Sequence, residues 1–170
     1  MSNNQNKHKV YPDKEAYDYV MKSLARKGVT IGSIAEITYQ LESPYIKGLT
    51  LDACSKTVNS VLKKRDVLSN IMVGLEIDRL AEENKLSEPL NSIINTDLGL
   101  FPVDEVIGTA ICNTFGLIGV TNYGYVDKKK KGIIEKLDKD TEHCNTFIDD
   151  IVGAVASAAA AKVAHRNNFK

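Results

Sequence analysis

The strongest constraint on the fold is a segment near the C-terminus that is apolar on every side. From Thr146 to about Arg166 the chain reads as one helix, and alanine fills much of it, as in the run Ala158–Ala161. A helix that is apolar all round is covered by other elements rather than lying on the surface. Small side chains also let those neighbours approach closely. We therefore predict that residues 1–170 form one all-α domain, a helical bundle with this Ala-rich helix buried at its centre.

The rest of the chain reads as shorter helices divided by capping and breaking residues. We expect three glycines, Gly116, Gly119 and Gly124, to loosen the chain ahead of a charged loop over residues 127–132. The first ten residues are polar and lack an apolar core, so we expect them to be disordered. The expected helices start near the following residues: Asp13, Ile31, Leu51, Asp66, Pro89, Pro102, Ile133 and Thr146.

The overall composition excludes several classes of partner and compartment. Lys+Arg and Asp+Glu are both 22, so the net charge is zero and gives no electrostatic case for binding nucleic acid. Cys54, Cys112 and Cys144 are far apart and have no metal-ligand spacing, which indicates a reducing compartment. No apolar run reaches the roughly 18 residues of a membrane span. We expect a cytoplasmic homo-oligomer, a dimer or tetramer, with peripheral contact at the inner face of the membrane left open.

Two short stretches repeat one acidic pattern. Asp104 and Glu105 precede Gly108 at helical spacing, and Asp149 and Asp150 precede Gly153 in the same way. Carboxylates at the mouth of an apolar helix are costly to bury unless they are paired or bind a cation. If the two helices crossed at their glycines, four carboxylates would come together. Grouped oxygen ligands of this kind suit Mg²⁺.

Ordinary helix capping is the competing interpretation of the second pair. Thr146 and Asp149 have the spacing of a capping box, and acidic residues stabilise the first turn of any helix. Capping accounts less well for Asp150, which points about 100° further round the helix. From the residues alone a metal site and a structural role both stay open, and a non-catalytic helical module that oligomerises is the alternative to an enzyme.

A lysine run lies between the two acidic pairs. Asp127 is followed by four lysines, Lys128–Lys131, which could hold a phosphate group or form a solvated loop. The connector Asp138–Glu142 resembles the start of a calcium loop, but its sixth position is His143 instead of glycine. We therefore interpret that connector as a solvated turn.

Taken in order, these motifs resemble those of the phosphatidylglycerophosphatase A family, in particular its soluble branch of YutG-like and low-temperature-requirement C proteins. The shared elements are D-E-x-x-G at 104–108, D-x-x-K at 127–130 and D-D-x-x-G at 149–153. The chain departs from the family pattern at Gly124, where an arginine is usual, and at Lys131, where a proline is usual.

The resemblance implies an all-α fold and Mg²⁺-dependent removal of a phosphate monoester, with phosphatidylglycerophosphate converted to phosphatidylglycerol. A soluble phosphorylated substrate is the alternative. The implied metal ligands are Asp104, Glu105, Asp149 and Asp150. The implied catalytic residues are Glu105, Asp127 and Lys130, with Lys130 and Lys128 holding the substrate phosphate.

Overall fold

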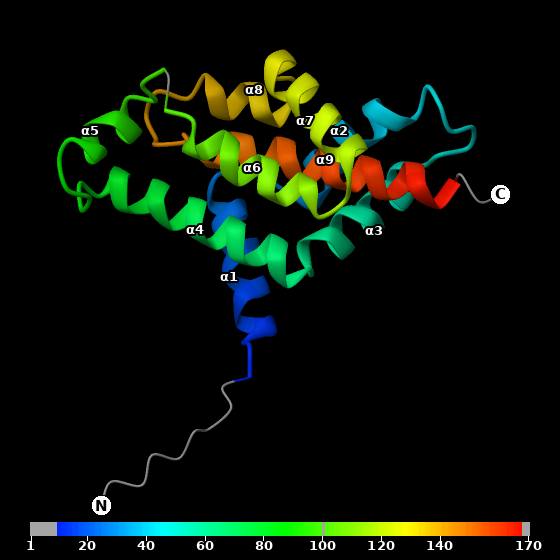
Figure 1. The fold of residues 1–170 in the computed structure, drawn as a ribbon, viewed down its shortest axis with the longest axis horizontal. Coiled ribbons are helices and arrows are strands. Elements are labelled where there is room, and N and C mark those ends of the chain that lie inside the picture. Colours follow the sequence, from blue (N-terminus) through cyan, green and yellow to red (C-terminus); the bar gives the residue numbers. More distant parts are fainter. Residues whose placement is uncertain (1–9, 100, 168–170) are drawn as a thin grey trace, which may run out of the picture.

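The computed structural model describes residues 10–99 and 101–167, and these fold into nine helices without a strand (Figure 1). The prediction of disorder at the N-terminus concerns residues 1–9, which lie outside the described part. Most helices begin within one or two residues of their predicted starts. The helices are α1 (Asp13–Arg26), α2 (Ile31–Glu42), α3 (Leu51–Leu62), α4 (Arg65–Glu82), α5 (Leu90–Asn95), α6 (Val103–Asn113), α7 (Leu117–Lys129), α8 (Ile133–Asp138) and α9 (Ile148–Asn167).

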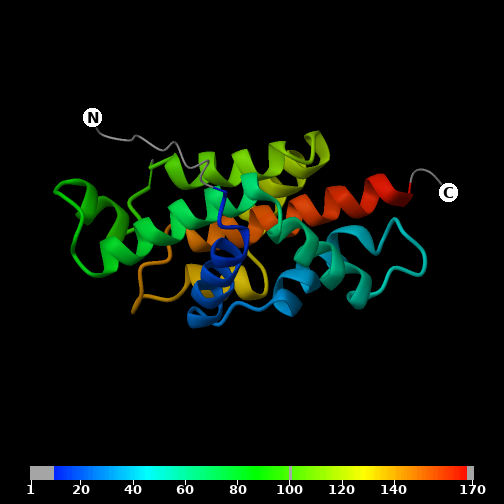
Figure 2. The ribbon, with the colours of Figure 1, turned by 90° about the horizontal axis from the view of Figure 1, so that it is seen from below.

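Helix α9 is the central element, which confirms the prediction from its alanine content. Fifteen of its 20 residues are buried, and α2, α3, α4, α6, α7 and α8 all pack against it. Figure 2 shows α9, in orange to red, running along the middle of the molecule with other helices on both sides. Because α9 is covered all round, polar residues near its N-terminus are buried together with the alanines that follow.

Helix α7 corrects the prediction for residues 116–132. Asp127, Lys128 and Lys129 are helical, so only the last part of the expected loop is irregular. The glycines do not loosen this segment. A Cβ at Gly119 would lie 3.0 Å from the carbonyl oxygen of Cys112 in α6, so glycine there permits close packing. Packing against α6 and α9 outweighs the low helix propensity of glycine.

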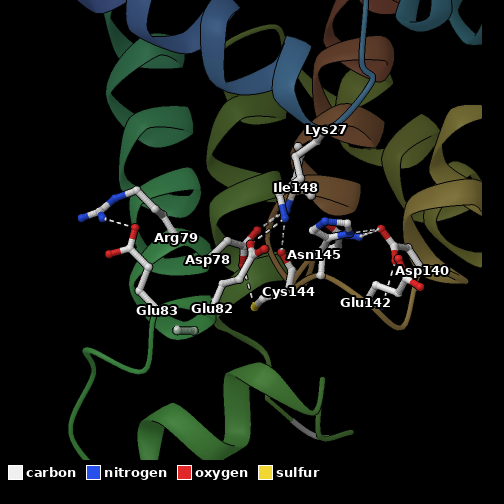
Figure 3. Close-up of polar contacts among 12 residues, drawn as sticks. Lys27, Asp78, Arg79, Glu82, Glu83, Asp140, Glu142, Cys144, Asn145 and Ile148 are labelled. Carbon is white, nitrogen blue, oxygen red and sulfur yellow. Dashed lines mark hydrogen bonds and ion pairs between the residues drawn. The ribbon is translucent and has the colours of Figure 1, made fainter.

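The start of α9 does not use the capping box that was the competing interpretation of Thr146 and Asp149. The helix begins at Ile148, and the hydroxyl of Thr146 donates instead to the carbonyl oxygen of Ile94, at 2.6 Å. The cap comes from α4: a carboxylate oxygen of Asp78 accepts from the backbone N–H of Phe147 at 3.0 Å, and the second accepts from that of Ile148, also at 3.0 Å. Figure 3 shows Asp78 beside Ile148. Asp149 is therefore not the main cap: its Oδ1 accepts only from the backbone N–H of Asp150, at 2.9 Å, and its Oδ2 faces Lys130.

None of the helices within residues 10–99 and 101–167 is both long and apolar enough to cross a membrane.

Candidate active site at the acidic end of the central helix

The N-terminal ends of α6 and α9 and the C-terminal end of α7 meet at one end of the bundle. They bring together Asp104 from α6, Asp127 from α7, and Asp149 and Asp150 from α9. Asp104, Asp149 and Asp150 are each buried, with 5–7% of their surface exposed. We call these four residues the acidic cluster. The cluster contains Asp104 from the first acidic pair, and both Asp149 and Asp150 from the second.

Lys130 is the cation that contacts this cluster. Its ammonium lies 2.7 Å from Oδ2 of Asp149, 3.1 Å from Oδ1 of Asp138 and 3.6 Å from Oδ1 of Asp127. Burial alone would lower the pKa of Lys130, but the bonds to Asp149 and Asp138 outweigh it and raise the pKa. The lysine is therefore a firmly charged group placed among three aspartates.

Asp150 has a different partner, the hydroxyl of Tyr123 in α7. That hydroxyl donates to Oδ1 of Asp150 at 2.5 Å, in the buried interior. Burial, followed by the negative charge of Asp149, raises the pKa of Asp150 to about 8. Burial also raises the pKa of Asp149 to about 6, in spite of its bond to Lys130. The pKa of Asp104 is raised by burial as well. Ionising these carboxylates in the metal-free protein is therefore costly, mainly because they are buried.

Gly108, the glycine of the first pattern, makes room for Tyr123, whereas Gly153 of the second lies in ordinary contact with Val126 and Ile134. A Cβ at Gly108 would lie 2.4 Å from the Tyr123 hydroxyl oxygen, and a Cβ at Gly153 would lie 3.7 Å from a carbon of the same ring. The helices α6 and α9 do pack together, and the atoms nearest to an added Cβ at Gly108 or Gly153 belong to α7 and α8 rather than to the other glycine. The absence of a side chain at Gly108 lets an aromatic side chain from a third helix reach Asp150.

Two predicted site residues lie away from the buried carboxylates. Glu105 is exposed and lines a shallow surface depression with Val106 and Thr109 on the outer side of α6. Lys128 is exposed on α7. In the described part of the chain, neither side chain forms a hydrogen bond or ion pair with the acidic cluster.

The structure also brings in residues that were not predicted to belong to the site. Asp138 ends α8 and pairs with Lys130, so it is more than part of a solvated turn. Asp97 lies close enough for its charge to raise the pKa of both Asp104 and Asp149. A cavity of about 260 Å³ opens beside Asp149, and its polar lining includes Asp97, Asp138, Asp140 and Asn145. Only the fold reveals these neighbours, because no local spacing links them.

The donor set fits a divalent cation in chemistry but is not a preformed coordination sphere. Within the described residues, no three Asp, Glu, His or Cys side chains are close enough to hold a metal as they stand. The carboxylates nevertheless have free acceptor capacity. Asp104 accepts from the N–H of the adjacent Glu105, and Asp150 accepts from Tyr123. A bound divalent cation would favour the ionised form of these buried carboxylates, and carboxylate oxygens with spare lone pairs are the ligands that Mg²⁺ prefers.

Comparison with protein families settles the relationship. Residues 21–165 match the family model described as phosphatidylglycerophosphatase A. The chain belongs to the phosphatidylglycerophosphatase A family. The matched range includes every member of the acidic cluster and Lys130, so the resemblance noted from three motifs is confirmed over most of the chain.

Individual relatives of this phosphatidylglycerophosphatase A family chain are similar over nearly their whole length. It is 49% identical to the uncharacterized protein YutG of Bacillus subtilis (strain 168), covering 84% of this chain and 87% of that protein. The crystal structure of YpjQ from Bacillus subtilis matches with a TM-score of 0.89 at 42% identity, covering 94% of this chain and 99% of YpjQ. The low temperature requirement C protein of Listeria monocytogenes gives a TM-score of 0.87 at 44% identity, covering 90% of this chain and 97% of the other.

Membership of the phosphatidylglycerophosphatase A family points to a phosphatase that acts on a phosphoric monoester. The acidic cluster with Lys130 is the part of the molecule suited to that chemistry, because it combines oxygen ligands with a charged group able to contact phosphate.

Proposed function

We propose that this protein is a Mg²⁺-dependent phosphatase that hydrolyses phosphatidylglycerophosphate to phosphatidylglycerol. The observation that carries the proposal is the burial of Asp104, Asp149 and Asp150 around one end of α9 with Lys130 as their cationic neighbour. A buried site of this charge is stabilised by a divalent cation, and the family relationship supplies the class of reaction.

The three buried aspartates are the residues that would hold Mg²⁺. When bound, the ion would neutralise charge on the phosphate oxygens and lower the pKa of water. The chain's own contribution is to fix these ligands on two helices that pack together, α6 and α9. Tyr123 orients Asp150 through its hydroxyl hydrogen bond, so one carboxylate oxygen is held while the other stays free.

Lys130 is the group best placed to bind the substrate phosphate. It lies at the end of α7 in a left-handed conformation, with φ 36°, and about a third of its side chain is exposed. Its ammonium is shared by Asp127, Asp138 and Asp149, and a phosphate dianion offers a stronger charged partner. Lys130 would then offset negative charge on the phosphoryl group as the ester bond breaks.

The general base is the remaining role. Asp127 is half-buried and lies 3.6 Å from the Lys130 ammonium, which puts it beside the proposed phosphate position. Glu105 is exposed on the outer side of α6. The geometry therefore favours Asp127 over Glu105 for accepting the proton of the attacking water, while Glu105 and Lys128 remain candidates only at the solvent edge.

The experiment measures phosphate release with and without Mg²⁺. Phosphatidylglycerophosphate in detergent micelles is compared with glycerol 3-phosphate, and Asp149→Asn and Asp150→Asn with the exposed control Asp52→Asn. We expect turnover only with Mg²⁺, a preference for the lipid, and at least about a hundredfold loss in both cluster variants. Turnover of the soluble ester alone would replace the lipid substrate. No Mg²⁺-dependent turnover of either ester would leave the non-catalytic oligomeric module as the better account.

A further inference from the structure

The opposite end of α9 carries a depression with cationic walls. It has a volume of about 550 Å³ and is lined by Thr114, Phe115, Gly116, Lys162, His165 and Arg166. Lys162 and Arg166 are one helical turn apart on α9. No carboxylate is among the lining residues, so this depression is opposite in charge to the acidic cluster.

The cations of this depression have no acidic partner within residues 10–99 and 101–167. The ammonium of Lys162 donates to the hydroxyl of Ser60 at 2.8 Å and lies 6.0 Å from the ring centre of Phe115. No ion pair joins Lys162 or Arg166 to a described carboxylate. Burial and the charge of Arg166 both lower the pKa of Lys162. Two like charges held together without a counter-ion are unfavourable, and a bound anion would relieve that cost.

A second feature on the facing wall also favours an anion. Gly116, with φ 88°, precedes the 13 residues of α7, and no side chain caps that helix. The first turn of α7 has no acidic residue. A carbon of the His165 ring lies 3.8 Å from the Cβ position of Gly116, so the start of α7 lies beside His165. The backbone N–H groups of an uncapped helix start attract phosphate.

Helix capping by basic residues explains only part of this arrangement. His165 and Arg166 lie in the last turn of α9, where positive charge stabilises the carbonyl end of the helix. Lys162 lies a turn earlier and is held by Ser60 and Phe115 instead. The start of α7 on the other wall is independent of the α9 dipole.

We propose that this depression binds a phosphate group, either of a free phosphate or of an anionic lipid headgroup. Lys162 and Arg166 would contact the phosphate oxygens from one side, and the first N–H groups of α7 from the other. Lys162 is 13 residues along α9 from Asp149, or roughly 20 Å at 1.5 Å per residue. The site is thus separate from the acidic cluster, and the inference does not depend on the proposed function.

Titration of the full chain with inorganic phosphate tests the binding directly, with the amide signals of Gly116 and Ile118 followed by NMR. We expect both signals to shift with saturation, and Lys162→Gln/Arg166→Gln to weaken the affinity about tenfold or more. The control Lys14→Gln/Lys56→Gln removes the same charge from two exposed lysines and should bind as the wild type does. If the double variant fails to fold, Arg166→Gln alone replaces it. Unshifted amides, or equal affinity in all variants, would overturn the proposal.

Vesicle flotation then distinguishes the two sources of phosphate. Phosphatidylcholine vesicles with phosphatidylglycerol are compared with phosphatidylcholine alone at physiological salt. Retention on the anionic vesicles that the double variant loses would assign the site to a lipid headgroup. Amide shifts with inorganic phosphate but no retention would assign it to a free phosphate. The absence of both effects refutes the proposal.

Discussion

Replacing Asp78 tests the origin of the start of α9. This aspartate lies on α4, is 2% exposed, and accepts from the backbone N–H groups of Phe147 and Ile148. Burial raises its pKa to about 8, although these hydrogen bonds and Lys27 lower it. In Asp78→Ala both N–H groups would be left buried without a partner. In Asp78→Asn one oxygen would remain as an acceptor, and the other would be replaced by an amide NH₂ group that cannot accept.

The structure sets the size of the two effects. A buried donor left without a partner costs about 1–3 kcal/mol, and loss of an N-terminal cap costs about 1 kcal/mol. Two donors lose their acceptor in Asp78→Ala, while the removal of a poorly solvated carboxyl offsets part of the loss. We expect the free energy of unfolding to fall by about 2–4 kcal/mol in Asp78→Ala. In Asp78→Asn the expected fall is about 1 kcal/mol.

Urea unfolding followed by far-ultraviolet circular dichroism at pH 7 measures these differences. The matched control is Asp52→Ala, which removes an exposed carboxylate from the first turn of α3 and its pair with Lys56. That control should change the free energy of unfolding by less than about 1 kcal/mol. If Asp78→Ala cost no more than Asp52→Ala, the position of α9 would not depend on this contact with α4. The account of how the acidic residues are held in place would then be wrong.

Two further predictions concern packing and pH at the acidic cluster. Gly108→Ala should cost about 1–3 kcal/mol of unfolding free energy because its Cβ would lie 2.4 Å from the Tyr123 hydroxyl oxygen. Gly124→Ala, with nothing within 4 Å, should be neutral or slightly stabilising, and equal losses in the two variants would contradict this packing. The metal-free protein should lose stability as the pH rises from 5 to 8. Folding raises the pKa of Asp149 from 3.8 to about 6 and that of Asp150 from 3.8 to about 8. The folded chain therefore binds more protons than the unfolded chain over this range, and a rise in pH favours unfolding. Urea unfolding between pH 5 and 8 measures this change in the free energy of unfolding. Asp150→Asn should reduce the dependence of that free energy on pH. A free energy of unfolding that rises with pH would refute the prediction.

The sequence was sufficient to predict which acidic residues are buried on α9 but not on α6. Adjacent residues on a helix point about 100° apart, so on a helix with one open face one member of a pair can be buried while the other faces solvent. Helix α9 is covered on all sides, and Asp149 and Asp150 are both buried. Helix α6 has an outer face, and only Asp104 is buried while Glu105 points to solvent. The alanine content of α9 indicated that this helix is buried on all sides. Nothing in the sequence of the first acidic pair indicated which of its two members faces inward.

Contacts between distant parts of the chain could not be predicted from the sequence. The cap that Asp78 gives to Phe147 spans 69 residues, and the pair of Lys130 with Asp149 spans 19. The helical conformation of α7 depends on packing against α6 and α9, which outweighs the low helix propensity of its two glycines, Gly119 and Gly124. Caps within a helix end are local by contrast: Thr30 accepts from the backbone N–H of Ser33 at the start of α2, and Thr50 from that of Ala53 at the start of α3.

In a helix that is apolar all round, charged side chains have a low free-energy cost only at its two ends. There the first N–H and last carbonyl groups lack partners within the helix, and the helix dipole favours acids at the start and bases at the finish. Helix α9 follows this distribution, with Asp149 and Asp150 in its first turn and His165 and Arg166 in its last. The same packing that buries the alanines therefore confines polar chemistry to two places of opposite charge. The first place suits a cation with its phosphate ester, and the second suits a phosphate group, free or in a lipid headgroup. Substitutions at the two ends should therefore have separable effects.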